Sequence, residues 1–472
     1  MTDRRKVRLA APPPSLLAAD FARIREQFSV SAEFPEEVVA AAHAAAARPL
    51  PAADRADLRS TPFFTVDPPG SMDLDQAMHL ERFGDGHRVR YAIADVGVFV
   101  DRGGPVEAEA WRRGVTVYTP DVRCPLYPTV LCEGAASLLP DEDRPATVFT
   151  IDLDGRGRQT SAAVERALVR SRAKLDYAGL DGERAALLRE IGERRRSLEA
   201  ERDAIALNAP EQIVAPDPSV PCGYRLEWQS RNPAEDWNAQ ISLLAGMAAA
   251  DIMLRHHVGL LRTMAGVDEY RVGVLRRAAA ALGVPWPATT GYADFARTLE
   301  PSNPHRAALL EQARAVMGRA GYTAFAGAAP ADGRHAGIAA AYAHTTAPLR
   351  RLADRYVLDL LVELGAGGTP AADEVETLER LPAVMEEAEA RASQVERAVV
   401  DGVEARLLEH RIGERFKAVV LEHDARGARL QITDPPVRAR LHADGSYPPG
   451  TTLAVRLVSA DPVGRALRFA PA

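Results

Sequence analysis

The stretch Asp67-Pro68-Pro69-Gly70-Ser71-Met72-Asp73-Leu74-Asp75-Gln76-Ala77 places three carboxylates within nine residues. Asp73 and Asp75 are two apart, so in an extended segment both point to the same face. Pro68-Pro69-Gly70 predicts a turn that folds Asp67 back beside this pair. Crowded carboxylates repel each other unless a cation neutralises them. The stretch therefore predicts either a magnesium or manganese site for phosphate chemistry or an acidic surface loop, and spacing alone favours neither.

Both flanks of the acidic stretch have the alternating pattern of β-strands. Residues 63–66 precede it, and residues 77–82 continue on its far side. Gly84-Asp85-Gly86 then predicts a hairpin turn, after which residues 88–96 return as a second strand. We therefore expect the acidic stretch to sit beside a strand in a sheet, which is a rigid place for catalytic groups.

Length and composition set the class of protein. A chain of 472 residues predicts about three domains. The net charge of −7 argues against a uniformly basic coat for nucleic acid, although it leaves room for a local basic channel. The three cysteines form no metal-binding spacing and favour a reducing cytoplasm. The longest apolar run, residues 241–253, is too short to span a bilayer, so we expect no membrane association.

A second dense stretch, residues 334–356, gathers several cationic side chains: His335, His344, Arg350, Arg351 and Arg355. Pro348 precedes an expected helix at residues 349–364. A proline at a helix start leaves backbone N–H groups free, and an arginine fork beside them suits phosphate. The alternative is a helix cap with solvated arginines, but the number of converging donors favours the phosphate role. Each histidine by itself is more often structural than catalytic.

Tyr118 lies in the segment RGVTVYTP, residues 113–120, next to a Thr-Pro turn. An aromatic ring in this position could stack on a nucleic-acid base. Packing in the core or the turn is the alternative, and from the residue alone it is the better one.

The two ends of the chain predict smaller units. Helical patterns at residues 15–28 and 35–49 form either a helix-turn-helix-like docking element or an extension packed on the main body. Residues 373–409 predict a charged helix pair. Five short strands follow within residues 416–469, which is typical of a small closed barrel of the OB type. Residues 411–472 hold ten Lys and Arg against six Asp and Glu, a local net charge of +4, which favours a grip on single-stranded nucleic acid over a protein contact.

In their order and spacing, the acidic stretch, RGVTVYTP and the segment HTTAPLRRLAD at residues 344–354 resemble the ribonuclease II / ribonuclease R family of 3′-to-5′ exoribonucleases. The resemblance covers roughly residues 55–405, and the C-terminal barrel resembles the family's RNA-binding OB domain. It implies an α+β protein with an N-terminal helical unit (residues 1–54), an RNB-type mixed α/β catalytic domain (55–410) and a five-stranded OB-fold barrel (411–472). The family's two cold-shock barrels have no counterpart in residues 1–60.

The resemblance also implies roles for single residues. Asp67, Asp73 and Asp75 match metal-binding aspartates, and Gln76 stands where the family has a fourth. Asp75 and Arg350 are the implied catalytic pair, with Arg350 holding the scissile phosphate. Tyr118 matches the aromatic residue that stacks near the RNA 3′ end and sets the length of the final product. The remaining expected RNA contacts are Arg351, His344 and Glu396.

From this resemblance we expect a monomeric, cytoplasmic enzyme that uses Mg²⁺ or Mn²⁺ to degrade single-stranded RNA to 5′-mononucleotides. Gln76 keeps a second interpretation open, because glutamine cannot neutralise charge as aspartate does. In that interpretation the chain is a catalytically inactive RNA-binding protein on the same fold. A metal-dependent DNA nuclease is a third and weaker interpretation.

Overall fold

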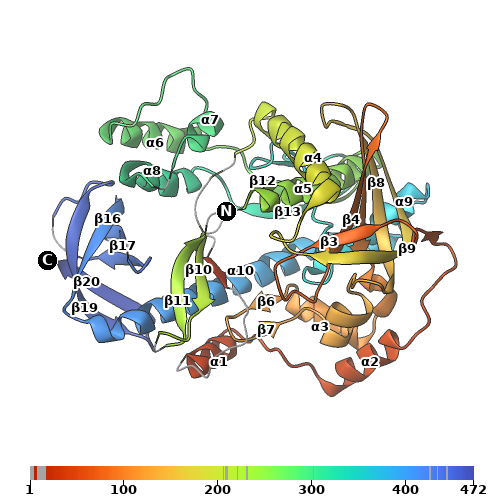
Figure 1. The fold of residues 1–472 in the computed structure, drawn as a ribbon, viewed down its shortest axis with the longest axis horizontal. Helices are drawn as coiled ribbons and strands as arrows, with labels where there is room; N and C mark the ends of the chain where they lie inside the picture. The colour runs from red at the N-terminus through yellow and green to blue at the C-terminus, as the bar shows by residue number, and fades with distance from the viewer. Residues whose placement is uncertain are drawn as a thin grey trace.

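A six-stranded sheet carries the acidic stretch in the computed structural model, which describes residues 5–7, 17–205, 207, 211–220, 222–229, 232–300, 302–424, 427–432, 434–442 and 445–472. The strand order is β2–β9–β3–β4–β5–β8, and β9 also pairs with β8. The strands are β2 (Ala56–Asp57), β3 (Phe63–Val66), β4 (Gln76–Phe83), β5 (Gly86–Ala94), β8 (Asp143–Leu153) and β9 (Gln159–Leu175). The acidic stretch connects β3 to β4, as predicted, so rigid strands hold both of its ends (Figure 1).

The hairpin between β4 and β5 is confirmed. Phe83 pairs with Gly86 at its end, and Gly84 has a φ of +58°, a conformation that a residue without Cβ adopts at little cost. All four residues of β3 are buried, as expected of a strand covered on both faces.

Helices enclose this sheet and complete the main core. They are α2 (Glu36–Ala46), α3 (Pro105–Arg113), α4 (Gly182–Glu201), α5 (Pro233–Arg255) and α9 (Leu352–Gly365). Gly246 in α5 packs directly against Tyr342, so that an added Cβ would fall 2.1 Å from the Tyr342 ring. The Gly246 carbonyl accepts a hydrogen bond from Ala343 N at 3.0 Å. This bond fixes the start of residues 343–351, which contain Arg350 and Arg351.

Shorter elements fill the space between the main core and the C-terminal barrel. One small sheet contains β1 (Arg5–Val7), β10 (Glu211–Pro216) and β11 (Tyr224–Gln229). Another contains β12 (Val258–Met264), β13 (Ala320–Ala326), β14 (Arg334–His335) and β15 (Ala340–Ala341). The hairpin strands β6 (Val117–Tyr118) and β7 (Arg123–Cys124) stand apart as a pair. A separate hydrophobic core is formed mainly by three helices, α6 (Glu269–Ala281), α7 (Tyr292–Arg297) and α8 (Pro304–Arg314).

A single helix replaces the helix pair expected at residues 373–409. It is α10 (Ala372–Leu408), and it crosses the molecule from the main sheet to the barrel (Figure 1). Leu378, Leu381 and Met385 are buried on both sides of Pro382, so packing on the core holds the helix continuous through the proline.

The C-terminal barrel is closed by five strands in the order β16–β17–β18–β20–β19, as predicted. The strands are β16 (Arg415–Asp424), β17 (Gly427–Ile432), β18 (Arg438–Leu441), β19 (Thr452–Asp461) and β20 (Ala466–Pro471). The α+β class is therefore confirmed. Within the described part of the chain, no helix has the length and apolar character needed to cross a membrane.

The two N-terminal helices join different cores. Helix α1 (Ala18–Gln27) buries Phe21 and Ile24 in the core shared by α10 and the barrel, whereas α2 buries Val38 and Ala42 in the core of the main sheet. This arrangement favours an extension packed on the main body over a separate docking element.

We predict that Phe21→Ala lowers the free energy of unfolding by about 3–5 kcal/mol, because a fully buried ring is removed. Phe21 packs edge-on against Tyr224 with 5.5 Å between ring centroids. Urea denaturation measures the change, and the exposed Glu26→Ala serves as the control, with an effect below about 0.5 kcal/mol. Equal effects of the two substitutions would contradict the packing of α1 on this core.

Candidate active site

Asp75 is a buried carboxylate that joins two distant segments of the chain. It is 3% exposed. Its Oδ1 accepts a hydrogen bond from Leu349 N at 2.8 Å, and its Oδ2 accepts one from Arg350 Nε at 3.0 Å. The acidic stretch and the arginine segment (residues 343–351) are therefore locked together.

The helix after this segment begins later than predicted. It starts at Leu352 rather than residue 349, so Pro348 and Arg350 lie in the non-helical segment before it. The Leu349 N–H, which was expected to be free for phosphate, donates to Asp75 instead. This N–H is therefore not available to an incoming anion.

Arg350 provides side-chain donors. Its side chain is 48% exposed although its Nε is held by a buried carboxylate. Among the described residues, neither Nη group of Arg350 has a hydrogen-bond partner. The guanidinium is thus fixed at its base and open at its tip, which is the geometry that binds two oxygens of a phosphate.

Asp73 has a partner that sequence reasoning missed. Its Oδ1 lies 2.8 Å from Arg123 Nη1, and Arg123 also contacts Glu133. Arg123 pairs with Tyr118 across the β6–β7 hairpin. The turn residues between them could have revealed this register, because a hairpin around Thr119–Val122 brings Arg123 opposite Tyr118.

Asp67 has an unsatisfied buried oxygen. Its Oδ2 makes no hydrogen bond and is inaccessible to solvent. Burial raises the pKa of Asp67 to about 6, and Asp73 contributes in the same direction. Burial also raises the pKa of Asp75 to about 7, with Arg350 and the Leu349 N–H opposing the rise. Both carboxyls are therefore in surroundings that disfavour their charge unless a cation is added.

The aspartates fit a divalent cation in chemistry but are not assembled around one. No three His, Cys, Asp or Glu side chains of the described ranges are grouped closely enough to hold a metal ion. Asp73 and Asp75 each have an oxygen engaged by an arginine, whereas Asp67 Oδ2 is unpartnered. A cation bound to Asp67, Asp73 and Asp75 would supply the missing positive charge to this oxygen.

Gln76 has a structural partner. Its Nε2 donates a hydrogen bond to the Thr346 carbonyl, so the side chain ties β4 to the arginine segment. Thr346 is also held by Ser242 of α5, with 2.8 Å between the two hydroxyl oxygens. A carboxylate in place of the Gln76 amide would face a carbonyl oxygen without a proton to share.

The expected RNA-binding residues divide into two groups. Tyr118 is half-buried near the aspartates and Arg350, and burial raises its pKa while Arg350 acts against the rise. Arg351 instead donates to both oxygens of the buried Asp354, at 2.5 and 2.7 Å. The structure therefore brings Tyr118 to Arg350 and gives Arg351 a partner within the protein.

Two further residues of that prediction lie in other surroundings. His344 Nδ1 is 2.7 Å from the Tyr322 hydroxyl, which donates to Glu389 of α10 at 3.1 Å. Burial lowers the pKa of His344, so the ring is neutral in this network. Glu396 is half-buried on α10. RNA contacts by Arg351, His344 and Glu396 stay predictions.

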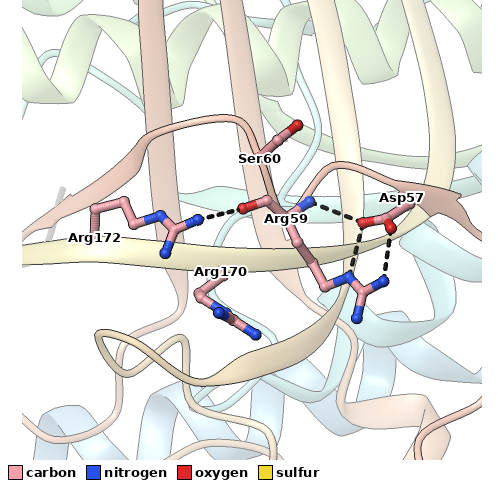
Figure 2. Close-up of a pocket in the computed structure, with 5 residues that line it drawn as sticks. All are labelled: Asp57, Arg59, Ser60, Arg170 and Arg172. Carbon is pink, nitrogen blue, oxygen red and sulfur yellow. Dashed lines mark hydrogen bonds and ion pairs between the residues drawn. The ribbon is translucent and has the colours of Figure 1, made fainter.

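A surface depression of about 380 Å³ lies where β2 meets β9 and is lined by Asp57, Arg59, Ser60, Arg170 and Arg172 (Figure 2). Arg59 is held by Asp57, and Arg170 by Asp143 at 2.6 Å. Carboxylates already engage two of the three arginines in this depression. It is therefore a weaker candidate phosphate site than Arg350.

We predict that Gln76→Glu lowers the free energy of unfolding by about 1–3 kcal/mol, because the donor to the Thr346 carbonyl is replaced by an oxygen of the same shape. Thermal or urea denaturation measures the change. The exposed Gln394→Glu on α10 is the matched control and has an effect below about 0.5 kcal/mol. A Gln76→Glu protein as stable as the control would show that this bond does not hold the two segments together.

Comparison with known proteins identifies the domains. An RNB domain matches residues 55–365, and an RNase II-type exonuclease C-terminal S1 domain matches residues 414–472. The chain is 27% identical over 432 residues to ribonuclease R of Escherichia coli strain K12, covering 83% of this chain and 51% of that protein. The chain thus spans about half the length of the curated relatives that it matches first.

Solved structures share the fold. Mycoplasma genitalium RNase R in complex with ribose-methylated single-stranded RNA superposes with a TM-score of 0.85 and 18% identity, over 96% of this chain and 78% of that one. Yeast Ssd1, a pseudonuclease, superposes with a TM-score of 0.69 and 19% identity, over 84% of this chain and 52% of that one. The same fold thus occurs in a ribonuclease and in a pseudonuclease. Since the RNB domain spans more than half of its residues, the chain belongs to the RNB family.

Proposed function

We propose that the chain is a 3′-to-5′ exoribonuclease that hydrolyses single-stranded RNA to 5′-mononucleotides with Mg²⁺. The observation that carries this proposal is Arg350, whose Nε is fixed by the buried Asp75 while its Nη groups are open to solvent. A neighbouring arginine, by contrast, has its tip engaged as well as its Nε. Arg351, one residue further, is engaged in this way by Asp354.

Arg350 would hold the scissile phosphate through its two Nη groups. Asp75 and the Leu349 N–H fix the direction of the guanidinium before substrate arrives, so little reorganisation is needed at the moment of reaction. Donors aimed at the phosphoryl oxygens stabilise the charge that grows on them during in-line attack by water.

Asp67, Asp73 and Asp75 would hold the divalent ion, with the Gln76 carbonyl as a further oxygen. When bound, Mg²⁺ or Mn²⁺ supplies an activated water and neutralises the leaving 3′-oxygen. The unpartnered Asp67 Oδ2 supports this role. Arg123, which holds Asp73, orients that carboxylate from the β6–β7 hairpin.

Tyr118 would stack on a base close to the 3′ end and place the terminal phosphodiester at Arg350. The barrel, with its local net charge of +4, would hold the strand upstream. The RNB and S1 matches support RNA as the substrate, and the free, buried Cys124, Cys132 and Cys222 support a reducing cytoplasm. We propose that the protein acts as a monomer in RNA turnover.

A second candidate is an RNA-binding protein without hydrolytic activity. Gln76 donates to a backbone carbonyl where the family has a fourth aspartate, and arginines engage Asp73 and Asp75. If a cation cannot displace these arginines, the fold binds RNA without cutting it.

A gel time course on 5′-labelled single-stranded RNA, with Mg²⁺ and with a chelator, separates the two candidates. A Mg²⁺-dependent ladder that collapses to a short end product supports the exoribonuclease. RNA that stays intact but shifts in a native gel would contradict hydrolysis and favour the binding protein.

We predict that Arg350→Ala lowers kcat by about 100- to 1,000-fold, because a charge-stabilising donor is lost from the transition state. The affinity for RNA, measured by filter binding in a chelator, falls much less. Arg172→Ala, at the exposed depression between β2 and β9, is the matched control with nearly unchanged kcat. Equal losses of kcat and affinity in Arg350→Ala would mean that Arg350 is an ordinary phosphate contact.

We predict that Mg²⁺ raises the melting temperature more at about pH 8 than at about pH 5, because a cation must displace protons from its ligands. The pKa values of Asp67 and Asp75 are about 6 and about 7, so both keep protons at the lower pH and lose them at the higher. Without metal, the free energy of unfolding falls across this window, since the folded state holds more protons. Differential scanning fluorimetry measures both trends, and an equal Mg²⁺ effect at both pH values, or one retained in Asp75→Asn, would contradict the metal assignment.

A further inference from the structure

The β6–β7 hairpin presents two side chains to the candidate active site. Tyr118 and Arg123 are paired across it, and Arg123 Nη1 lies 2.8 Å from Asp73. The strand leading into the hairpin is also bonded to the arginine segment, since Thr116 N donates to the Arg350 carbonyl at 3.0 Å. Leu352 N donates to the Gly114 carbonyl at 2.9 Å. A shift of the hairpin therefore moves groups on both sides of Arg350.

The turn of this hairpin is held from outside by α1. Arg25 Nη1 donates to Asp121 Oδ1 at 2.7 Å and to Thr119 Oγ1 at 3.0 Å. The Arg25 side chain is 15% exposed and that of Asp121 is 9% exposed, so solvent screens the pair weakly. Thr119 is fully buried, and its hydroxyl lies 2.7 Å from the Val122 carbonyl, which its backbone N–H also reaches at 3.0 Å.

Helix α1 is itself immobilised at other points. Asp20 Oδ2 accepts from Arg406 Nη2 of α10 at 2.7 Å, and Phe21 is buried against Tyr224. Figure 1 shows α1 beside β6 and β7 at the lower side of the molecule, below α10. Arg25 thus connects a firmly packed helix to a turn of four residues whose own hairpin has only two residues in each strand.

We propose that Arg25 is a positioning residue for the exonuclease reaction, which fixes the β6–β7 hairpin through Asp121 and Thr119 and so determines the length of the shortest RNA that the enzyme still shortens. This inference rests on the proposed function. An exonuclease stops when the remaining RNA is too short to reach both its stacking contact and the scissile position. A hairpin that is free to shift places Tyr118 at variable distances from Arg350, so the stopping point becomes longer and less uniform.

The test compares end products of 5′-labelled single-stranded RNA for the wild type and for Arg25→Ala, Arg25→Lys and Asp121→Asn. We expect Arg25→Ala and Asp121→Asn to leave end products that are longer and spread over several lengths, with the initial rate on long RNA reduced less than about tenfold. Arg25→Lys, which keeps one charged donor to Asp121, restores most of the wild-type pattern. The double variant Arg25→Ala/Asp121→Asn has no larger effect than Arg25→Ala alone, because Arg25→Ala already removes the contact with Asp121.

Asp20→Asn is the matched control, because it weakens the ion pairs of Asp20 with Arg406 and Arg23 without touching the hairpin. It is expected to lower the melting temperature while keeping the wild-type end product. The positioning role would be overturned if Arg25→Ala and Asp121→Asn gave wild-type end products and only lost stability, as Asp20→Asn does. That result would leave the proposed exonuclease function intact. RNA left uncut by the wild type would overturn both.

Discussion

The hydrogen bonds that Asp75 accepts from Leu349 N and Arg350 Nε are the constraint on which the site depends. They join residues that are about 275 positions apart, and they do so in the interior, where an unpaired carboxylate is costly. Everything else near the site is arranged around this pair. Gln76 ties the same two segments through Thr346, and Thr116, the residue before β6, donates its N–H to the Arg350 carbonyl. Arg350 is thereby fixed at its base and available at its tip.

The sequence predicted the elements that depend on local patterns. Residues 63–66 and the hairpin at Gly84–Gly86 form as expected, because aromatic and β-branched residues flanking a glycine turn leave few alternatives. The five barrel strands were also found, since each is a short alternating run ended by a turn. Local spacing and a turn grouped Asp67 with Asp73 and Asp75, whereas the role of Arg350 as their catalytic partner followed from the family resemblance.

What the sequence could not show depends on tertiary packing. Pro382 would normally end a helix, but buried residues on both sides, Leu381 before it and Met385 after it, keep α10 continuous. Helix α9 begins at Leu352 because Arg351 is extended and bridges to Val115, while Leu352 N donates to the Gly114 carbonyl. The Arg123–Asp73 pair depends on the register of a hairpin with two residues per strand, and the engagement of Arg351 by Asp354 could not be distinguished from an open arginine. Sequence reasoning therefore named both Arg350 and Arg351 but could not tell which of the two has an open side chain.

If the site formed by Arg350 and the aspartates hydrolyses RNA from the 3′ end, the terminal nucleotide is the first product. Single-stranded RNA labelled at its 3′-terminal phosphodiester is incubated with the protein and Mg²⁺, and the products are separated by chromatography. The account predicts that the label is released at the earliest times as a 5′-mononucleotide and that a chelator abolishes the release. Label that stays in full-length RNA, or that appears first in internal fragments, would contradict it.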